Sequence, residues 1–244
     1  MNKLLKYIRY IIIIFSVVLA IVIKILVQRS LPLESLSDIR LGEIYALVTL
    51  IYLYLTLLVS PLYFNFPQTP FRALYVKARR SLGVSVFLFA ALHSYYEFFK
   101  LLGGLSGLQF LSGKYLFATI LGIIDITVLA LLASTSFNYA VKKLGKKWKM
   151  LHRMVYLAGI FIIIHALILG THFINLSNAI PTIFFIALIV LMVLEAFRFG
   201  KYISGHFPKL SEQTASYLTA TIFLAAIIYL YLYVGSGIAG HHIH

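Results

Sequence analysis

Residues 146–173 read KKWKMLHRMVYLAGIFIIIHALILGTHF, and this stretch decides the predicted fold. It begins as a basic segment that contains a tryptophan, and it continues as an apolar run long enough to cross a bilayer as a helix. His152, His165 and His172 lie inside this run or at its edges. A polar side chain in hydrocarbon is unfavourable without a partner, so we interpret these histidines as functional. The partner that we expect is iron.

The composition indicates a polytopic membrane protein. Of the 244 residues, 61% are hydrophobic and only 11% are charged, whereas a soluble domain of this size needs more polar surface. The absence of cysteine excludes disulfides, thiolate metal sites, iron–sulfur clusters and covalently attached c-type heme. A tightly bound metal therefore depends on other side chains, and histidine, with eight copies, is the plentiful one.

The basic charge is interpreted as a determinant of orientation. The formal net charge is +14, but the cations stand in short clusters between apolar runs, which is typical of topogenic loops. We therefore expect no nucleic-acid partner. The sequence contains no Walker A motif and no GxGxxG motif, so no nucleotide-binding domain is expected within it.

Apolar runs of about 20 residues each predict an all-α bundle of about seven transmembrane helices. The runs are 10–27, 41–63, 82–102, 115–137, 151–170, 179–199 and 214–234. Most of the 21 Lys and Arg residues fall on the side that also holds the amino terminus. The amino terminus is therefore predicted to be cytoplasmic, in an inner membrane, and the carboxyl end is predicted to lie outside.

Two histidines are predicted to lie at similar depth on parallel helices. His93 is about 16 Å into the run 82–102 at about 1.5 Å per residue, and His165 lies at a comparable depth in the run 151–170. Two imidazoles at one level suit a heme with two histidine ligands better than a tetrahedral zinc site, which needs four ligands. The alternative is that both are buried histidines that hydrogen-bond to the backbone or to Asp125.

Three segments of the chain carry a family resemblance. They are ARRSLG at 78–83, FLFAALH at 87–93 and STSFNYAVKKLGKKWKMLHRMVYLAGIFIIIH at 134–165. With these segments, the chain from about 41 to 199 resembles the ferric reductase-like transmembrane domain family. That family includes the heme-binding membrane subunit of bacterial methionine sulfoxide reductase systems.

The resemblance implies a b-type heme domain that passes electrons across the membrane. It implies that His93 pairs with His165 on one heme, and that His152 serves a second heme near the cytoplasmic face in two-heme members. It also implies that residues 41–200 form the heme-binding core. Residues 1–40 then supply a first helix and outer loop, and residues 201–244 supply an extra helix and outer tail.

The sequence departs from the two-heme pattern at Arg80. Arg80 stands 13 residues before His93, which is the spacing between the ligands of successive hemes in the two-heme pattern. A guanidinium has no lone pair to give to iron. A second heme would leave His152 in need of another partner. Arg79, Arg80 and residues 146–149 are interpreted first as topogenic charges. Their second interpretation is a site for an anionic partner at the cytoplasmic surface, such as a heme propionate, a flavin phosphate or an acidic reductase. His172 either contacts a heme edge or is a surface histidine at the outer boundary.

The remaining polar residues each have a structural interpretation, and most also have a functional one. Asp125, in the middle of the run 115–137, is either a functional group or a structural polar anchor. Glu195 and Arg198 have the spacing of an i,i+3 ion pair. Glu97 either orients a ligand or is an interfacial carboxylate. The terminal histidines, His241, His242 and His244, either capture an external metal or belong to a flexible end.

The sequence predicts an oxidoreductase subunit for heme-dependent electron transport. Electrons would come from a quinol or a separate flavin reductase, with flavin or quinone at the cytoplasmic side. They would pass to an outer-face acceptor protein or metal ion. The alternatives are a proton or divalent-metal transporter that uses intramembrane His and Asp, and a scaffold without cofactor.

Overall fold

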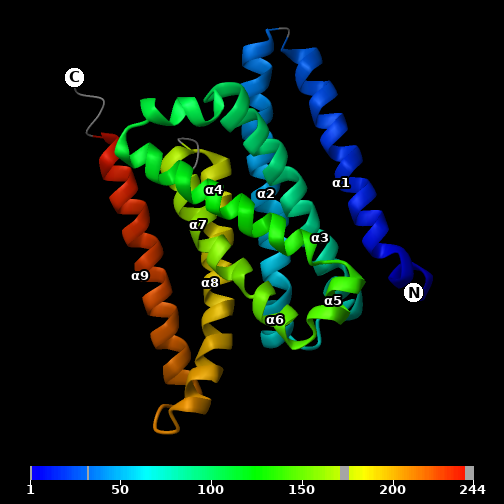
Figure 1. Ribbon diagram of the computed structural model, residues 1–244. Helices are drawn as coiled ribbons and strands as arrows, with labels where there is room; N and C mark the ends of the chain where they lie inside the picture. The colour runs from blue at the N-terminus through cyan, green and yellow to red at the C-terminus, as the bar shows by residue number, and fades with distance from the viewer. Residues whose placement is uncertain (1, 32, 171–175, 240–244) are drawn as a thin grey trace. The chain divides into compact units, whose positions relative to one another are not determined.

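The computed structural model describes residues 2–31, 33–170 and 176–239, and every regular element in these ranges is a helix (Figure 1). The α-helices are α1 (Asn2–Ser30), α2 (Glu34–Asn65), α3 (Arg72–Ser94), α4 (Gly113–Ser134), α5 (Asn138–Leu144), α6 (Lys146–His152), α7 (Met154–Leu169), α8 (Ala179–His206) and α9 (Glu212–Ala239). A π-helix, η1 (Tyr95–Leu101), and a 3-10 helix, η2 (Gly104–Phe110), follow α3. The all-α prediction is confirmed.

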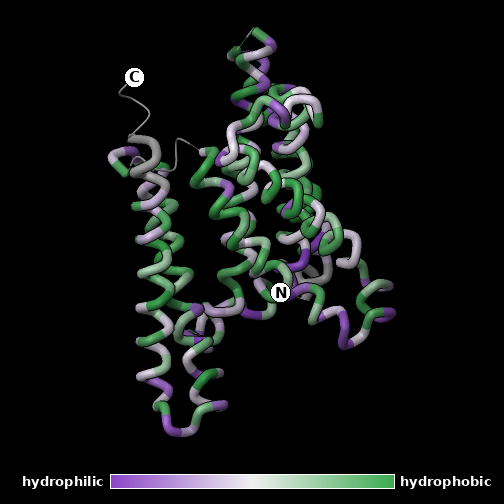
Figure 2. Tube along the Cα trace, turned by 60° about the vertical axis from the view of Figure 1, so that its left-hand side comes forward, coloured by the Kyte–Doolittle hydropathy of each residue, from purple (hydrophilic) through white to green (hydrophobic). Residues whose placement is uncertain are grey.

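Seven helical stretches of the described residues are long and apolar enough to cross a membrane. They are Tyr7–Ser30, Glu34–Asn65, Arg72–Leu101, Gly113–Ser134, Lys146–Leu169, Ala179–His206 and Glu212–Tyr233. Figure 2 shows hydrophobic residues along these helices and hydrophilic residues gathered near their ends. The prediction of seven spanning helices is therefore confirmed.

Two of the predicted runs are not uninterrupted α-helices. The run 82–102 changes at Tyr95 into η1, where the amide of Leu102 donates to the carbonyl of Glu97, five residues earlier, at 2.9 Å. The stretch from Lys146 to Leu169 is interrupted at Arg153, whose amide is shared between the carbonyls of Lys149 and Met150, both at 3.2 Å. Such local changes of helical pitch often accompany functional positions.

The chain forms two compact units. The first comprises residues 1–56 and 71–162, and the second comprises residues 57–70 and 163–244. In the first unit, α1 packs against α3, and α3 packs against α4. The hydroxyl of Ser16 on α1 lies 2.8 Å from Ser85 on α3 and 3.0 Å from Tyr52 on α2, so a buried polar contact joins these three helices.

The second unit is built mainly on the pair α8 and α9. A side chain at Gly200 on α8 would overlap the backbone of Ser216 on α9, so the two helices approach closely there. The carboxyl end of α2 also belongs to this unit. The Asn65 amide there donates to the Leu194 carbonyl on α8 at 2.9 Å and to the Pro61 carbonyl at 2.7 Å.

Candidate functional site

His93 lies on α3, one residue before this helix ends. Its Nδ1 is 3.0 Å from the carbonyl oxygen of Gly42 on α2. Because a carbonyl oxygen only accepts hydrogen bonds, Nδ1 carries the hydrogen, and the neutral ring then has its lone pair on Nε2. Histidines that bind metals commonly donate their other ring N–H in this way, because the bond fixes the ring and its tautomer.

Gly42 also makes room for Glu97. The Glu97 side chain, on η1, packs so close to Gly42 that a β-carbon at this position would overlap its carboxylate. Glycine at position 42 therefore lets η1 approach α2 next to the carbonyl that holds His93. A backbone hydrogen bond at one ring nitrogen is expected both of a structural histidine and of an iron ligand. The two roles differ in whether the other nitrogen, Nε2, binds iron.

His152, at the end of α6, is held by a hydrogen bond to the end of α4. Its Nε2 is 3.2 Å from the hydroxyl of Thr135, at the end of α4. That hydroxyl also donates to the carbonyl of Leu131 at 2.7 Å, so its oxygen accepts from Nε2–H of His152. The neutral His152 ring in this arrangement has its lone pair on Nδ1.

Trp148 connects His152 to Arg80. Its indole ring is stacked on the His152 ring with centroids 4.0 Å apart, and the Arg80 guanidinium lies 5.4 Å from the indole centroid. The indole N–H donates to the Thr135 carbonyl at 2.9 Å. Cation–π contact and stacking, with the bond to Thr135, together fix α6 against the first half of α3 and the end of α4. Sequence reasoning treated Arg80 and His152 separately and missed both Trp148 and Thr135.

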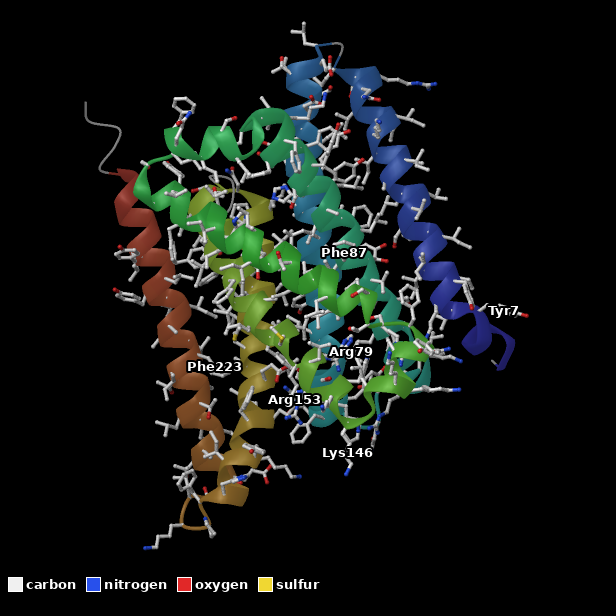
Figure 3. All side chains as sticks on the ribbon, viewed as in Figure 1. Tyr7, Arg79, Phe87, Lys146, Arg153 and Phe223 are labelled. Atoms are coloured by element: carbon white, nitrogen blue, oxygen red, sulfur yellow. The ribbon has the colours of Figure 1, made fainter. Side chains whose placement is uncertain are left out.

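Arg80 is further held by Asn138, the first residue of α5. The Asn138 side-chain oxygen accepts from Arg80 at 2.9 Å and from Arg9 at 3.2 Å. Figure 3 places Arg79, Lys146 and Arg153 toward the same end of the first unit, so this end gathers cationic side chains. Its chemistry therefore suits an anionic group.

His165 lies on α7 and is partly buried. It belongs to the second unit, whereas His93 and His152 belong to the first. Small residues on both histidine helices are buried: Ala90 is 7% exposed and Ala158 is 1% exposed. His172 and the terminal histidines lie outside the described residues.

The buried carboxylates differ in their surroundings. Glu195 forms the expected ion pair with Arg198 at 2.7 Å, which confirms the prediction from spacing. Asp125 on α4 is 3% exposed, and neither carboxylate oxygen has a hydrogen-bond partner among the described residues. Within residues 2–31, 33–170 and 176–239, no group of three His, Asp or Glu residues is arranged to hold a metal ion. A heme held by two imidazoles does not require such a group.

Comparison with known proteins identifies the family to which the chain belongs. Residues 41–163 match the family described as "Ferric reductase like transmembrane component". The "Protein-methionine-sulfoxide reductase heme-binding subunit MsrQ" of Salmonella enteritidis is 36% identical over 155 residues, which cover 62% of this chain and 72% of that protein. The MsrQ proteins of Salmonella paratyphi B and Salmonella newport are each 41% identical over 120 residues, covering 48% of this chain and 57% of theirs. No solved structure matches the chain significantly.

Proposed function

Because the chain belongs to the family of ferric reductase-like transmembrane components, we propose that it is a b-type heme protein that passes electrons across the membrane. The relatives are named as heme-binding subunits, and their similarity to this chain includes 36% identity over 155 residues. In this proposal, residues 41–200 form the heme-binding core. Residues 1–40 and 201–244 are its flanking parts.

His93 and His165 are the proposed axial ligands. The observation that carries this assignment is the hydrogen bond from Nδ1 of His93 to the Gly42 carbonyl, which leaves the lone pair on Nε2. His165, on α7, is the histidine that the family resemblance pairs with His93. Heme supplies one-electron chemistry when bound, and the chain supplies ligands, orientation and exclusion of water.

One heme is the count that we favour. A second heme held by His152 would need a lone pair from a ring whose Nε2 donates to Thr135. Its Nδ1 would have to serve instead, or the bond to Thr135 would have to break. Arg80 has a guanidinium where a two-heme pattern needs a ligand, and we propose that it contributes positive charge toward a heme propionate. His172 is retained as a proposed contact at the heme edge.

The electron donor is proposed to be a quinol or a separate flavin reductase on the cytoplasmic side, where flavin or quinone would bind. The acceptor is proposed to be a protein or metal ion at the outer face of an inner membrane. The relatives named above are subunits of a methionine sulfoxide reductase, which supports a separate catalytic partner for this chain as well. This chain would then be the membrane subunit of an oxidoreductase.

The test is the heme content of purified histidine variants. Wild-type protein produced with ample heme is expected to show a reducible low-spin spectrum with one heme per chain. His93→Ala and His165→Ala are expected to lose that heme, whereas His152→Ala is expected to keep it. His206→Ala is the matched control, because His206 is exposed at the end of α8, where its Nδ1 lies 2.9 Å from the Tyr202 carbonyl. A folded, colourless wild-type protein would refute the proposal.

A transporter is the second candidate, and Asp125 is the observation that favours it. A buried carboxylate without a partner among the described residues is typical of proton or cation pathways in membranes. Proton or divalent-metal flux into liposomes that stops in Asp125→Asn, in protein without heme, would support this function. Equal flux in wild type, Asp125→Asn and empty liposomes would exclude it.

A further inference from the structure

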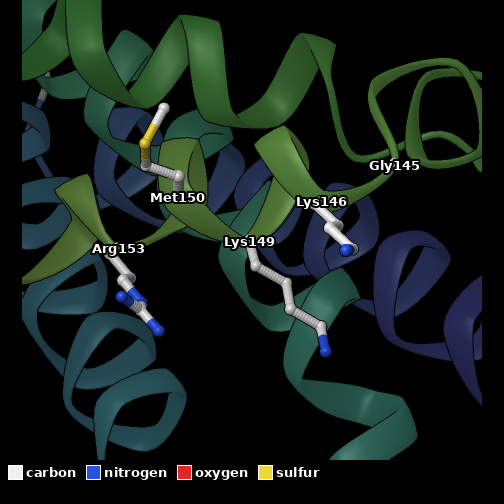
Figure 4. Close-up of a pocket in the computed structure, with 5 residues that line it drawn as sticks. All are labelled: Gly145, Lys146, Lys149, Met150 and Arg153. Carbon is white, nitrogen blue, oxygen red and sulfur yellow. The ribbon is translucent and has the colours of Figure 1, made fainter.

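A pocket of about 390 Å³ lies beside the junction of α6 and α7. Its lining consists of Gly145, Lys146, Lys149, Met150 and Arg153, all in the first unit. Figure 4 shows the side chains of the two lysines and the arginine extending to the same side of the backbone, while Met150 extends away from them. Three cations therefore border one concave surface.

Among the residues that the structure describes, these cations lack an acidic partner. Within the described part of the chain, neither Lys146 nor Lys149 nor the Arg153 side chain forms an ion pair. No Asp or Glu occurs between residues 138 and 153, a segment that also contains Lys142, Lys143 and Lys147. Like charges at helical spacing repel one another, so a bound anion would stabilise this arrangement.

The surroundings favour a lipid as the source of that anion. Phe137 and Tyr139, just before the lysines, and Met150, between Lys149 and Arg153, are 68%, 74% and 67% exposed. Exposed aromatic and apolar side chains among lysines are typical of segments that lie at the membrane interface. Basic pockets on the cytoplasmic side of membrane proteins bind the headgroups of acidic lipids.

A ligand with an aromatic ring fits this pocket poorly. The adjacent indole of Trp148 is already stacked on His152 and contacted by Arg80. Met150 is the only large apolar residue in the lining. A flavin or a nucleotide would thus find phosphate ligands here but no aromatic surface on which to stack.

We propose that this pocket binds the phosphate-bearing headgroup of an acidic phospholipid. The Arg153 guanidinium offers paired N–H donors to phosphate oxygens, and Lys146 and Lys149 add point charges. The lipid would anchor α6, and with it the stacked pair of Trp148 and His152, at the cytoplasmic surface. This site is separate from the proposed heme ligands and does not depend on that assignment.

Native mass spectrometry of the purified protein, with whatever cofactor it retains, tests the site. The protein is incubated in detergent with equal amounts of phosphatidylglycerol and phosphatidylcholine that have the same acyl chains. We expect the wild-type protein to retain phosphatidylglycerol preferentially. The triple variant Lys146→Gln, Lys149→Gln, Arg153→Gln is expected to lose this preference. The ratio of bound phosphatidylglycerol to bound phosphatidylcholine should fall by about fivefold for each charge removed, and thus on the order of 100-fold in all.

The matched control is Lys142→Gln, Lys143→Gln, Lys147→Gln, which removes the same charge from exposed positions of the same segment outside the pocket. It is expected to keep the preference nearly unchanged. Lys149→Gln alone, with a fivefold expected loss, provides the test should the triple variant fail to fold. Equal losses in the pocket variant and its control would overturn the proposal, as would equal retention of both lipids. Displacement of the lipid by millimolar inorganic phosphate would show a free-phosphate site instead.

Discussion

Asp125 and Glu195 are carboxylates with similar burial but different surroundings. They are 3% and 5% exposed, respectively. Glu195 lies 2.7 Å from the Arg198 guanidinium, whereas the described residues offer Asp125 no hydrogen-bond donor. Removing one partner of a buried ion pair leaves the other charge buried and uncompensated, which lowers stability. Removing the charge of a carboxylate that has no partner leaves no such uncompensated charge behind.

We therefore expect opposite outcomes for two amide substitutions of equal size. Glu195→Gln should lower the free energy of unfolding by about 1–3 kcal/mol, because Arg198 loses its counter-charge. Asp125→Asn should leave it within about 0.5 kcal/mol of the wild-type value, or raise it. Unfolding by SDS titration in mixed micelles measures both. A loss in Asp125→Asn as large as that in Glu195→Gln would show that Asp125 has a charged partner.

Residues were predictable from sequence where their partners are near in the chain or where their chemistry is distinctive. The pair of Glu195 and Arg198 was readable from i,i+3 spacing, and the histidines stood out in apolar runs. Gly42 as the partner of His93 was not readable, because 51 residues separate them and a backbone carbonyl has no sequence signature. Thr135 was missed as the partner of His152 for the same kind of reason, since it lies at the end of α4, 17 residues earlier in the chain.

At the scale of helices, the contact between α8 and α9 depends on Gly200. A β-carbon there would overlap the Ser216 backbone, which cannot move aside as a flexible side-chain end can. Small residues allow membrane helices to approach closely, and this contact is an instance of that rule.

Gly200→Ala is expected to lower the free energy of unfolding by about 1–3 kcal/mol, because it forces α8 and α9 apart. Gly205→Ala is the matched control on the same helix, because nothing lies within 4 Å of its β-carbon position. It should be neutral or stabilising by up to about 1 kcal/mol through helix propensity. The SDS titration described above distinguishes the two, and equal effects would contradict the close approach of the helices.

Hydropathy predicted the number of spanning helices, because each span must bury its backbone polar groups within one apolar helix. It did not predict the π-helical turn from Tyr95 to Leu101 or the interruption at Arg153. Both are shifts of backbone hydrogen bonding by one residue within a continuous apolar or amphipathic run. A period calculated over the whole run does not register such local changes.

At the scale of the whole molecule, the distribution of cations predicts the orientation in the membrane. Lys114, at the start of α4, is predicted to face outside, and Lys209, between α8 and α9, to face the cytoplasm. The absence of cysteine makes the chain suitable for single-cysteine labelling. In intact spheroplasts, a membrane-impermeant maleimide should label Lys114→Cys but not Lys209→Cys until the membrane is permeabilised. Immediate labelling of Lys209→Cys would reverse the predicted orientation.

The grouping of residues into two compact units was not predictable from the order of the apolar runs. Residues 57–70 belong with the carboxyl-terminal unit although residues 1–56 do not. Contacts such as that of Asn65 with Leu194, 129 residues apart, produce this grouping, and neither composition nor spacing encodes them.

The most direct test of the central claim is rescue of a ligand by imidazole. His93→Gly and His165→Gly should each lose the low-spin heme spectrum, and added imidazole should restore it, because a free imidazole can replace a missing axial ligand. His152→Gly should keep the spectrum without imidazole. A complete low-spin spectrum in His93→Gly or His165→Gly before imidazole is added would contradict the assignment of these two histidines to iron.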